Sequence, residues 1–196
     1  MRCLLTMLLG LFLSSAMAAP VIIPAPPQLA TEGHILLDAV TGAVLVEQNA
    51  EMRLPPASLT KIMTSYVIAS EIAAGRISPQ DTVPISVKAW KTEGSRMFIR
   101  EGTEVSVEDL IRGIVIQSGN DASVAMAEYI AGDEAAFADV MNQIAQQLGM
   151  TRSQFKNATG LPDEGHYTTA KDMSILAQAL IRDYPGHYEI YREKYF

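Results

Sequence analysis

The segment between Pro55-Pro56 and Gly75 constrains the fold of this chain most, because it predicts a helix that is apolar on almost every side. The two prolines fix the entry to the helix, and the glycine ends it. A helix without a polar face must be surrounded by other elements, so we expect it at the centre of a core. Its apolar residues are Leu59, Ile62, Met63, Tyr66, Val67, Ile68, Ala69, Ile72 and Ala73.

Ser58 and Lys61 stand at the start of this helix, three residues apart and therefore on one face. An unpaired ammonium in a core is costly, so a lysine here needs a partner or a chemical task. Burial lowers the pKa of an amine toward physiological pH, and an uncharged Lys61 could take the proton of the Ser58 hydroxyl. The pair predicts a covalent acyl-transfer site. The alternative is Ser58 as a plain N-cap with Lys61 reaching solvent.

The same spacing occurs once more, at Ser153 and Lys156, in a polar stretch that follows the helix-ending Gly149. Nothing in that stretch predicts burial of the lysine, so we interpret it as a solvated loop.

The N-terminus has the composition of an export signal over residues 1–18. Arg2 is followed by an apolar core and by Ala16-Met17-Ala18 as a small-residue cleavage site. A retained membrane anchor is the alternative, but the apolar run is short for a bilayer. Four prolines in residues 19–31 predict an extended leader. We therefore expect an exported protein.

Composition excludes several classes of function. The formal net charge of the 196 residues is −7 and no basic run occurs, which argues against nucleic-acid binding. The three histidines, His34, His166 and His187, lack metal-ligand spacing, so each is expected to be a surface or hydrogen-bonded residue. We expect no metal and no cofactor.

The rest of the chain predicts an α+β fold. His34–Asp38 and Ala43–Glu47 alternate as in a β-hairpin, and residues 76–105 predict irregular structure with short strands at 82–87 and 97–99. Helices follow, and four residues are expected to cap them: Ser106, Asp121, Asp133 and Thr169.

Ser118-Gly119-Asn120 falls between two of these helices, on a tight turn. Such a turn presents a hydroxyl and a carboxamide on one side, suited to relaying a proton and holding a peptide carbonyl. The alternative is an ordinary helix–helix connection, since Ser, Gly and Asn are common loop residues.

Four segments occur in the order found in a known family: Ser58-Leu59-Thr60-Lys61, Gly94–Phe98, Ser118-Gly119-Asn120 and Asn157–Pro162. From about Gly33 to Phe196 the chain resembles the D-alanyl-D-alanine carboxypeptidases among the low-molecular-mass penicillin-binding proteins. The resemblance implies a β-lactamase/transpeptidase-like fold, with an N-terminal hairpin and a helical lobe. It also implies peptidoglycan stem peptides as substrates, acylation by β-lactams, and a location in the periplasm or on the outer face of the cytoplasmic membrane.

The same resemblance implies a role for each motif residue. Ser58 is the nucleophile that forms an acyl-enzyme on the penultimate D-alanine, and Lys61 is its general base. Ser118 passes the proton to the leaving D-alanine. Asn120 orients the substrate or holds Lys61 by a hydrogen bond.

The third motif of the family, Lys-Thr-Gly, does not occur in these residues. We therefore interpret residues 32–196 as a partial, C-terminally truncated catalytic domain that lacks the later strands of the sheet. The membrane-binding C-terminal segment of many relatives is expected to be missing as well. We expect this chain alone neither to fold stably nor to turn over substrate.

Three alternatives remain open at the level of sequence. A serine β-lactamase would need a carboxylate near Ser58, and Glu164 is the candidate. A murein D,D-endopeptidase would use the same residues on cross-links. A non-catalytic, wall-binding pseudoenzyme would keep the fold without the third motif.

Overall fold

The computed structural model describes residues 25 and 27–196, so the predicted signal peptide and most of the leader lie outside the described residues. No helix in the described part of the chain is long and apolar enough to cross a bilayer. The principal elements are β1 (His34–Leu37), β2 (Val44–Gln48), α1 (Thr60–Ala73), β3 (Thr82–Pro84), α2 (Val87–Lys91), β4 (Glu104–Ser106), α3 (Val107–Gln117), α4 (Asn120–Ala131), α5 (Glu134–Leu148), α6 (Ala170–Asp183) and α7 (Pro185–Tyr188), with 3₁₀ turns at Ala57–Leu59 and Glu189–Arg192.

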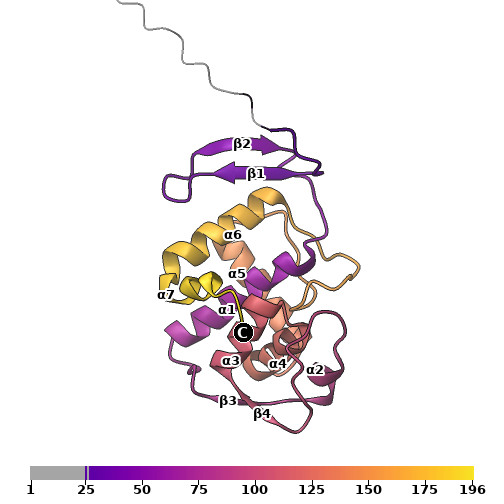
Figure 1. Cartoon of the computed structure of the whole chain (residues 1–196). Helices are drawn as coiled ribbons and strands as arrows, with labels where there is room; N and C mark the ends of the chain where they lie inside the picture. Colours follow the sequence, from indigo (N-terminus) through magenta and orange to yellow (C-terminus); the bar gives the residue numbers. More distant parts are fainter. Residues whose placement is uncertain (1–24, 26) are drawn as a thin grey trace, which may run out of the picture.

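Helix α1 lies in the middle of the molecule and contacts α3, α4, α5 and α6 (Figure 1). The β1–β2 hairpin covers α6 at one end, and the small β3–β4 sheet lies beside α4 at the other. The predicted α+β class and the N-terminal hairpin with a helical lobe are confirmed.

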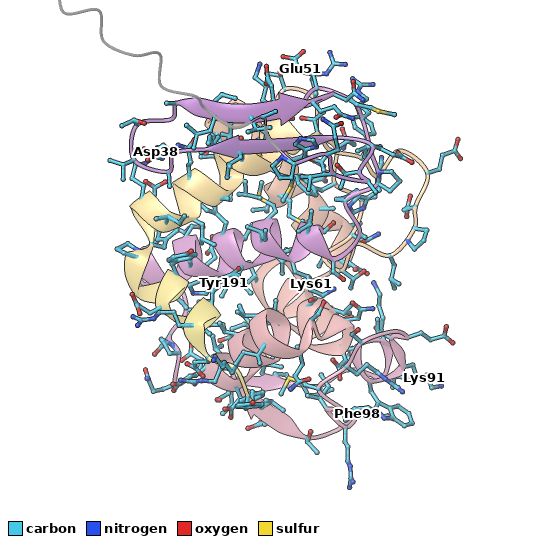
Figure 2. All side chains as sticks on the ribbon, turned by 45° about the horizontal axis from the view of Figure 1, so that its top comes forward. Asp38, Glu51, Lys61, Lys91, Phe98 and Tyr191 are labelled. Carbon is cyan, nitrogen blue, oxygen red and sulfur yellow. The ribbon has the colours of Figure 1, made fainter. Side chains whose placement is uncertain are left out.

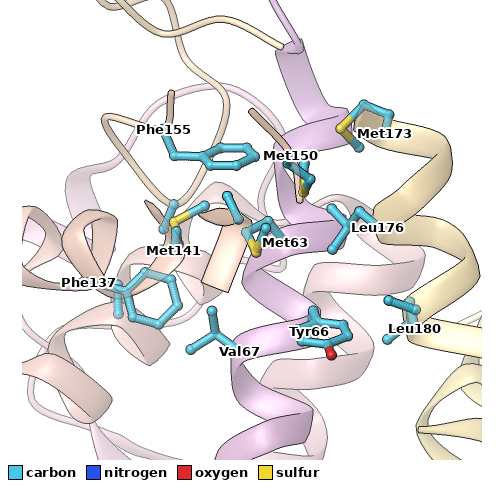
Figure 3. Packing of buried hydrophobic residues seen from close by; sticks show 14 residues of the cluster. Met63, Tyr66, Val67, Phe137, Met141, Met150, Phe155, Met173, Leu176 and Leu180 are labelled. Carbon is cyan, nitrogen blue, oxygen red and sulfur yellow. The ribbon is translucent and has the colours of Figure 1, made fainter. Parts of the chain in front are cut away.

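The core forms on two sides of α1. Met63, Tyr66 and Val67 pack with α5 and α6 in one cluster, which Figure 3 shows. Ile68 belongs to a second cluster with α3 and α4. The predicted burial of the helix is therefore confirmed for its first turns. Leu59, which precedes α1, is exposed, so its inclusion in the buried set was wrong.

The hairpin has antiparallel pairing that places Leu36 opposite Val46. Its turn is closed by Asp38, whose carboxylate accepts hydrogen bonds from the backbone N–H groups of Val40 and Thr41. A carboxylate that accepts its own turn's amides stabilises a tight connection between strands. The predicted hairpin is confirmed.

Three of the four predicted helix caps are confirmed. Ser106, Asp133 and Thr169 each accept a hydrogen bond from the backbone N–H three residues later. Asp121 does not cap α4, since the N-cap residue is Gly119 and Asp121 lies within the first turn.

The carboxylate of Asp121 instead accepts hydrogen bonds from the backbone N–H groups of three residues of a distant loop, Met97, Phe98 and Ile99. These residues were predicted as a strand, which is wrong because their amides bond a side chain rather than a neighbouring strand. The short helix α2, capped by Ser86, was missed, and β3 pairs with a strand at 104–106 that was not predicted.

The second serine–lysine spacing lies in a loop, as predicted, and Lys156 is exposed. The loop is not simply solvated, however. The Ser153 hydroxyl donates to Asp172, and Phe155 is fully buried in the core. These two tertiary contacts distinguish the segment from an ordinary polar loop.

Candidate active site

Ser58 lies in the 3₁₀ turn that leads into α1, and its side chain is exposed. The residue before it, Ala57, has a φ of 46°, a left-handed conformation that is unfavourable for a residue with a Cβ. Such a conformation persists only where the surroundings impose it, and it is concentrated at functional sites. The turn therefore presents Ser58 at the start of a buried helix at a cost in backbone strain.

Lys61 is nearly inaccessible, with 5% of its surface exposed, and lies in the interior of the molecule (Figure 2). Its Nζ lies 3.4 Å from Ser58 Oγ and donates a hydrogen bond of 2.7 Å to the backbone oxygen of Thr159. Burial lowers the pKa of Lys61 to about 8. The alternative of a lysine reaching solvent is contradicted by this geometry.

This pair can act as a nucleophile and a base. A lysine with a pKa near 8 is partly neutral at physiological pH, and a neutral amine can accept the hydroxyl proton of a serine. The separation of 3.4 Å is at the long end for a hydrogen bond, and such bonds commonly tighten once a substrate is bound.

Ser118 lies in the same place although it is far from Ser58 in the sequence. It ends α3 in a left-handed conformation, with φ 55° and ψ 37°. A cleft of about 90 Å³ is lined by Ser58, Lys61 and Ser118 together. The remaining lining residues are apolar or aromatic: Ile62, Ile114, Val115 and Tyr191. The structure therefore brings three of the four predicted site residues together around one small cleft.

Asn120 is buried, and its hydrogen bonds are made to a neighbouring loop and not to the residues that line this cleft. Its backbone N–H donates to the oxygen of Ser95 at 2.7 Å, and its side-chain Nδ2 donates to the oxygen of Glu93 at 2.6 Å. Gly94, between Glu93 and Ser95, has a φ of 91°, and a Cβ on this residue would lie 2.6 Å from Asn120 Nδ2. Asn120 thus holds the 93–95 loop against α4, and the alternative role of a hydrogen bond to Lys61 is not seen.

Two regions of the site were not predicted from the sequence. Tyr191 lines the cleft from the end of the described chain, and nothing in the local sequence indicates this. The 157–160 segment contacts α1 through backbone oxygens, with Thr159 bonded to Lys61 and Ala158 bonded to Thr64 Oγ1 at 2.7 Å. The sequence alone indicates no role for the Asn157–Pro162 motif.

The same segment is anchored by His166, which is buried. The backbone N–H of Lys156 donates to Nδ1 of His166, so the proton of a neutral ring lies on Nε2, which bonds Thr60 Oγ1 at 2.9 Å. Burial lowers the pKa of His166, which favours the neutral ring. The expectation that the histidines are hydrogen-bonded is confirmed, since His34 bonds Thr31 and His187 bonds Ser65.

The described residues contain no group of three or more acidic, histidine or cysteine side chains arranged to hold a metal ion. Glu164, the carboxylate considered for a β-lactamase, is exposed on its loop. Within residues 27–196, no carboxylate forms a hydrogen bond with Ser58 or Lys61. Within the described residues, the polar groups around Ser58 are therefore hydroxyls, one amine and backbone groups.

Comparison with known proteins gives a consistent result. A family model described as D-alanyl-D-alanine carboxypeptidase matches residues 20–196. The carboxypeptidase DacA of Escherichia coli K12 is 46% identical over 203 residues, which cover 98% of this chain and 50% of the relative. A D-alanyl-D-alanine endopeptidase of Pseudomonas aeruginosa is 30% identical over 94% of this chain and 61% of its own length.

Solved structures agree with these sequence matches. The carboxypeptidase DacD of Francisella tularensis has a TM-score of 0.88 at 45% identity, covering 91% of this chain and 43% of that one. Penicillin-binding protein 5 of Haemophilus influenzae has a TM-score of 0.86 at 43% identity, covering 88% of this chain and 51% of that one. The predicted penicillin-binding-protein fold is confirmed. The chain spans about half the length of the curated carboxypeptidases that it matches.

Proposed function

The chain belongs to the D-alanyl-D-alanine carboxypeptidase family, and we propose that it is a serine D-Ala-D-Ala carboxypeptidase that works through an acyl-enzyme on Ser58. The observation that carries the proposal is the buried Lys61 amine, with its lowered pKa, 3.4 Å from the Ser58 hydroxyl. A serine beside a partly neutral amine is the arrangement that nucleophilic acyl transfer requires.

The proposed reaction has two steps. Lys61 takes the proton of Ser58 Oγ while that oxygen attacks the carbonyl of the penultimate D-alanine. The peptide bond to the last D-alanine then breaks, and Ser118, on the same cleft, delivers the proton to the leaving amine. Water hydrolyses the resulting ester, releasing the shortened stem peptide and restoring the Ser58 hydroxyl.

The same nucleophile explains a second class of ligand. A β-lactam carbonyl would be attacked by Ser58 Oγ, and the ring C–N bond would open with its proton supplied through Lys61 and Ser118. The opened ring remains attached as an ester, so the inhibitor occupies the nucleophile.

The proposed substrate is peptidoglycan, so the working enzyme would act outside the cytoplasm, in the periplasm or on the outer face of the membrane. Asn120 contributes to the substrate side of the site by holding the 93–95 loop in place.

The proposal is tested by labelling the 196-residue chain with a fluorescent penicillin and locating the adduct by mass spectrometry. The buried core around α1 and the Ser58–Lys61 pair support an active chain, against the inactivity expected from the missing third motif, so we expect the label on Ser58, and release of D-alanine from a diacyl-L-Lys-D-Ala-D-Ala peptide. Ser58→Ala should abolish both. Ser153→Ala removes the serine of the second Ser-x-x-Lys spacing and should retain both. A chain that neither accepts the label nor releases D-alanine would contradict the proposal and favour a non-catalytic wall-binding protein.

A D,D-endopeptidase is the second candidate, because a relative 30% identical to this chain has that activity in its name. The two reactions use the same acyl-enzyme and differ in the amine that leaves. Digestion of purified muropeptides separates them: a carboxypeptidase shortens monomeric pentapeptides, whereas an endopeptidase converts cross-linked dimers to monomers.

A further inference from the structure

The Asn157 side chain organises the loop that supplies a carbonyl to Lys61. Its Oδ1 accepts three hydrogen bonds, from Thr159 N at 3.1 Å, from Thr159 Oγ1 at 3.0 Å and from Gly160 N at 2.8 Å. Its Nδ2 donates to the oxygen of Leu161 at 3.0 Å. One amide side chain therefore satisfies both ends of a turn over residues 157–161, a pattern in which Asn replaces a backbone turn.

This turn has a specific consequence for helix α1. The oxygens of Ala158 and Thr159 both point at α1, where they accept hydrogen bonds from Thr64 Oγ1 and Lys61 Nζ. Successive carbonyls of an extended strand point to opposite sides, so a strand could not supply both acceptors. Lys61 and Thr64 are three residues apart on one face of a helix, and only a turned segment can bond both.

The acceptor matters because of the geometry of an amine. A neutral amine has two hydrogens and one lone pair in tetrahedral directions. When one hydrogen is bonded to the Thr159 oxygen, rotation about the last side-chain bond is restricted, and the lone pair can be directed at Ser58 Oγ. Within the described residues, Lys61 Nζ has only two polar partners, Ser58 Oγ and the Thr159 oxygen, and no ion pair. Burial is the cause of its lowered pKa. The Thr159 oxygen is therefore the contact that orients the base.

We propose that Asn157 is a positioning residue for the Lys61 base, acting through the turn that directs the Thr159 oxygen at the amine. The inference rests on the proposed acyl-transfer function and assigns a role to the Asn157–Pro162 motif. Asn157 touches neither Ser58 nor Lys61. Its effect passes through Thr159, which is 2% exposed and bonded on both sides.

Asn142 offers a matched control on the same segment. Its Oδ1 accepts from Phe155 N and its Nδ2 donates to Phe155 O, both at 2.8 Å. Asn142→Ala thus removes amide bonds to the backbone of this loop without touching the turn at 157–161. We expect Asn142→Ala and Asn157→Ala to lower the melting temperature by similar amounts, which separates loss of stability from loss of positioning.

The first readout is the rate of acylation by a fluorescent penicillin across a pH series. We expect Asn157→Ala to reduce the plateau rate at high pH, where Lys61 is neutral, by roughly tenfold to a hundredfold, because a misplaced base loses most of its effect. Asn142→Ala should retain the wild-type plateau within about twofold. Asn157→Asp keeps an acceptor for Thr159 and Gly160 but cannot donate to the Leu161 oxygen, so its plateau rate should lie between those of Asn157→Ala and the wild type. Equal plateau rates for Asn157→Ala and Asn142→Ala would overturn the proposal.

The second readout needs no acylation. NMR titration of the Lys61 side chain measures its pKa in each variant. A hydrogen bond to the ammonium favours the charged form, so its loss in Asn157→Ala should lower the pKa below that of the wild type and of Asn142→Ala. A midpoint equal to the wild-type value would show that the carbonyl contact does not depend on Asn157, and a midpoint above it would show that the amine has become solvated, which would overturn a role in positioning alone. If the wild-type chain takes up no penicillin, the proposed function fails, and this titration still decides the positioning role.

Discussion

The backbone carbonyl of Ala57 lies against Gly160 so closely that a methyl group on residue 160 would overlap it. Ala57 is the left-handed residue immediately before Ser58, and Gly160 has a φ of 86°. The strained turn that presents the nucleophile and the turn that supplies the carbonyl for Lys61 are therefore in direct contact. Neither can change its backbone without moving the other.

Replacing Gly160 should lower the stability of the chain. Gly160→Ala adds a clash with the Ala57 carbonyl to the cost of a left-handed alanine. The control is Gly75→Ala, where φ is 69° and a Cβ would have no atom within 4 Å. We expect Gly160→Ala to cost about 1–3 kcal/mol more free energy of unfolding than the control. Chemical denaturation measures the difference, and equal losses would show that the contact at Ala57 relaxes freely.

The acylation rate should follow the titration of Lys61. Because burial lowers the pKa of the amine to about 8, most of it is protonated below that pH and cannot act as a base. The rate should rise with pH, with a midpoint about 8, and reach a plateau once the amine is neutral. Labelling with a fluorescent penicillin measures the profile, with Ser58→Ala as the background. A rate that is flat between about pH 6 and pH 10 would remove Lys61 from the role of base.

Asp121 should be among the most important polar residues for stability. Its carboxylate is fully buried and accepts the amides of Met97, Phe98 and Ile99 as well as that of Ala122. Asp121→Ala leaves these donors without a partner, and we expect a loss of about 3 kcal/mol or more.

The matched control is Asp109→Ala, which removes an exposed carboxylate bonded to Ser106 in a helix cap. That change should cost about 1 kcal/mol or less. Thermal denaturation compares the two, and hydrogen exchange at residues 97–99 should increase only in Asp121→Ala. Unchanged exchange there would mean that the loop keeps its conformation without the carboxylate.

Glycine should be a better replacement for Phe98 than alanine. It has a φ of 65° and 74% of its surface is exposed, pointing into solvent at the edge of the molecule (Figure 2). Phe98→Gly relieves the left-handed strain, whereas Phe98→Ala keeps the strain and loses the same ring. The glycine variant should be more stable than the alanine variant by about 1 kcal/mol. A more stable alanine variant would show that the loop leaves this conformation in solution.

Local signals predicted the helices well. The predicted caps of α5 at Asp133 and of α6 at Thr169 were both correct. Capping, glycine termination and apolar spacing act over a few residues, so they are visible in one stretch of sequence. The loops failed where a distant group decided the structure, as at 97–99, where the amides are bonded by a carboxylate from α4.

The sequence by itself determined that a serine and a lysine lie three residues apart at the start of an apolar helix, because helical periodicity and apolar composition are properties of that segment alone. Only the tertiary structure decided which group accepts a hydrogen bond from the Lys61 amine, and which remote residues line the cleft beside Ser58. The Thr159 oxygen and Tyr191 contact the site from remote segments. A backbone carbonyl is common to every residue, so its direction follows from the packing of the chain and has no signature in the residue that carries it.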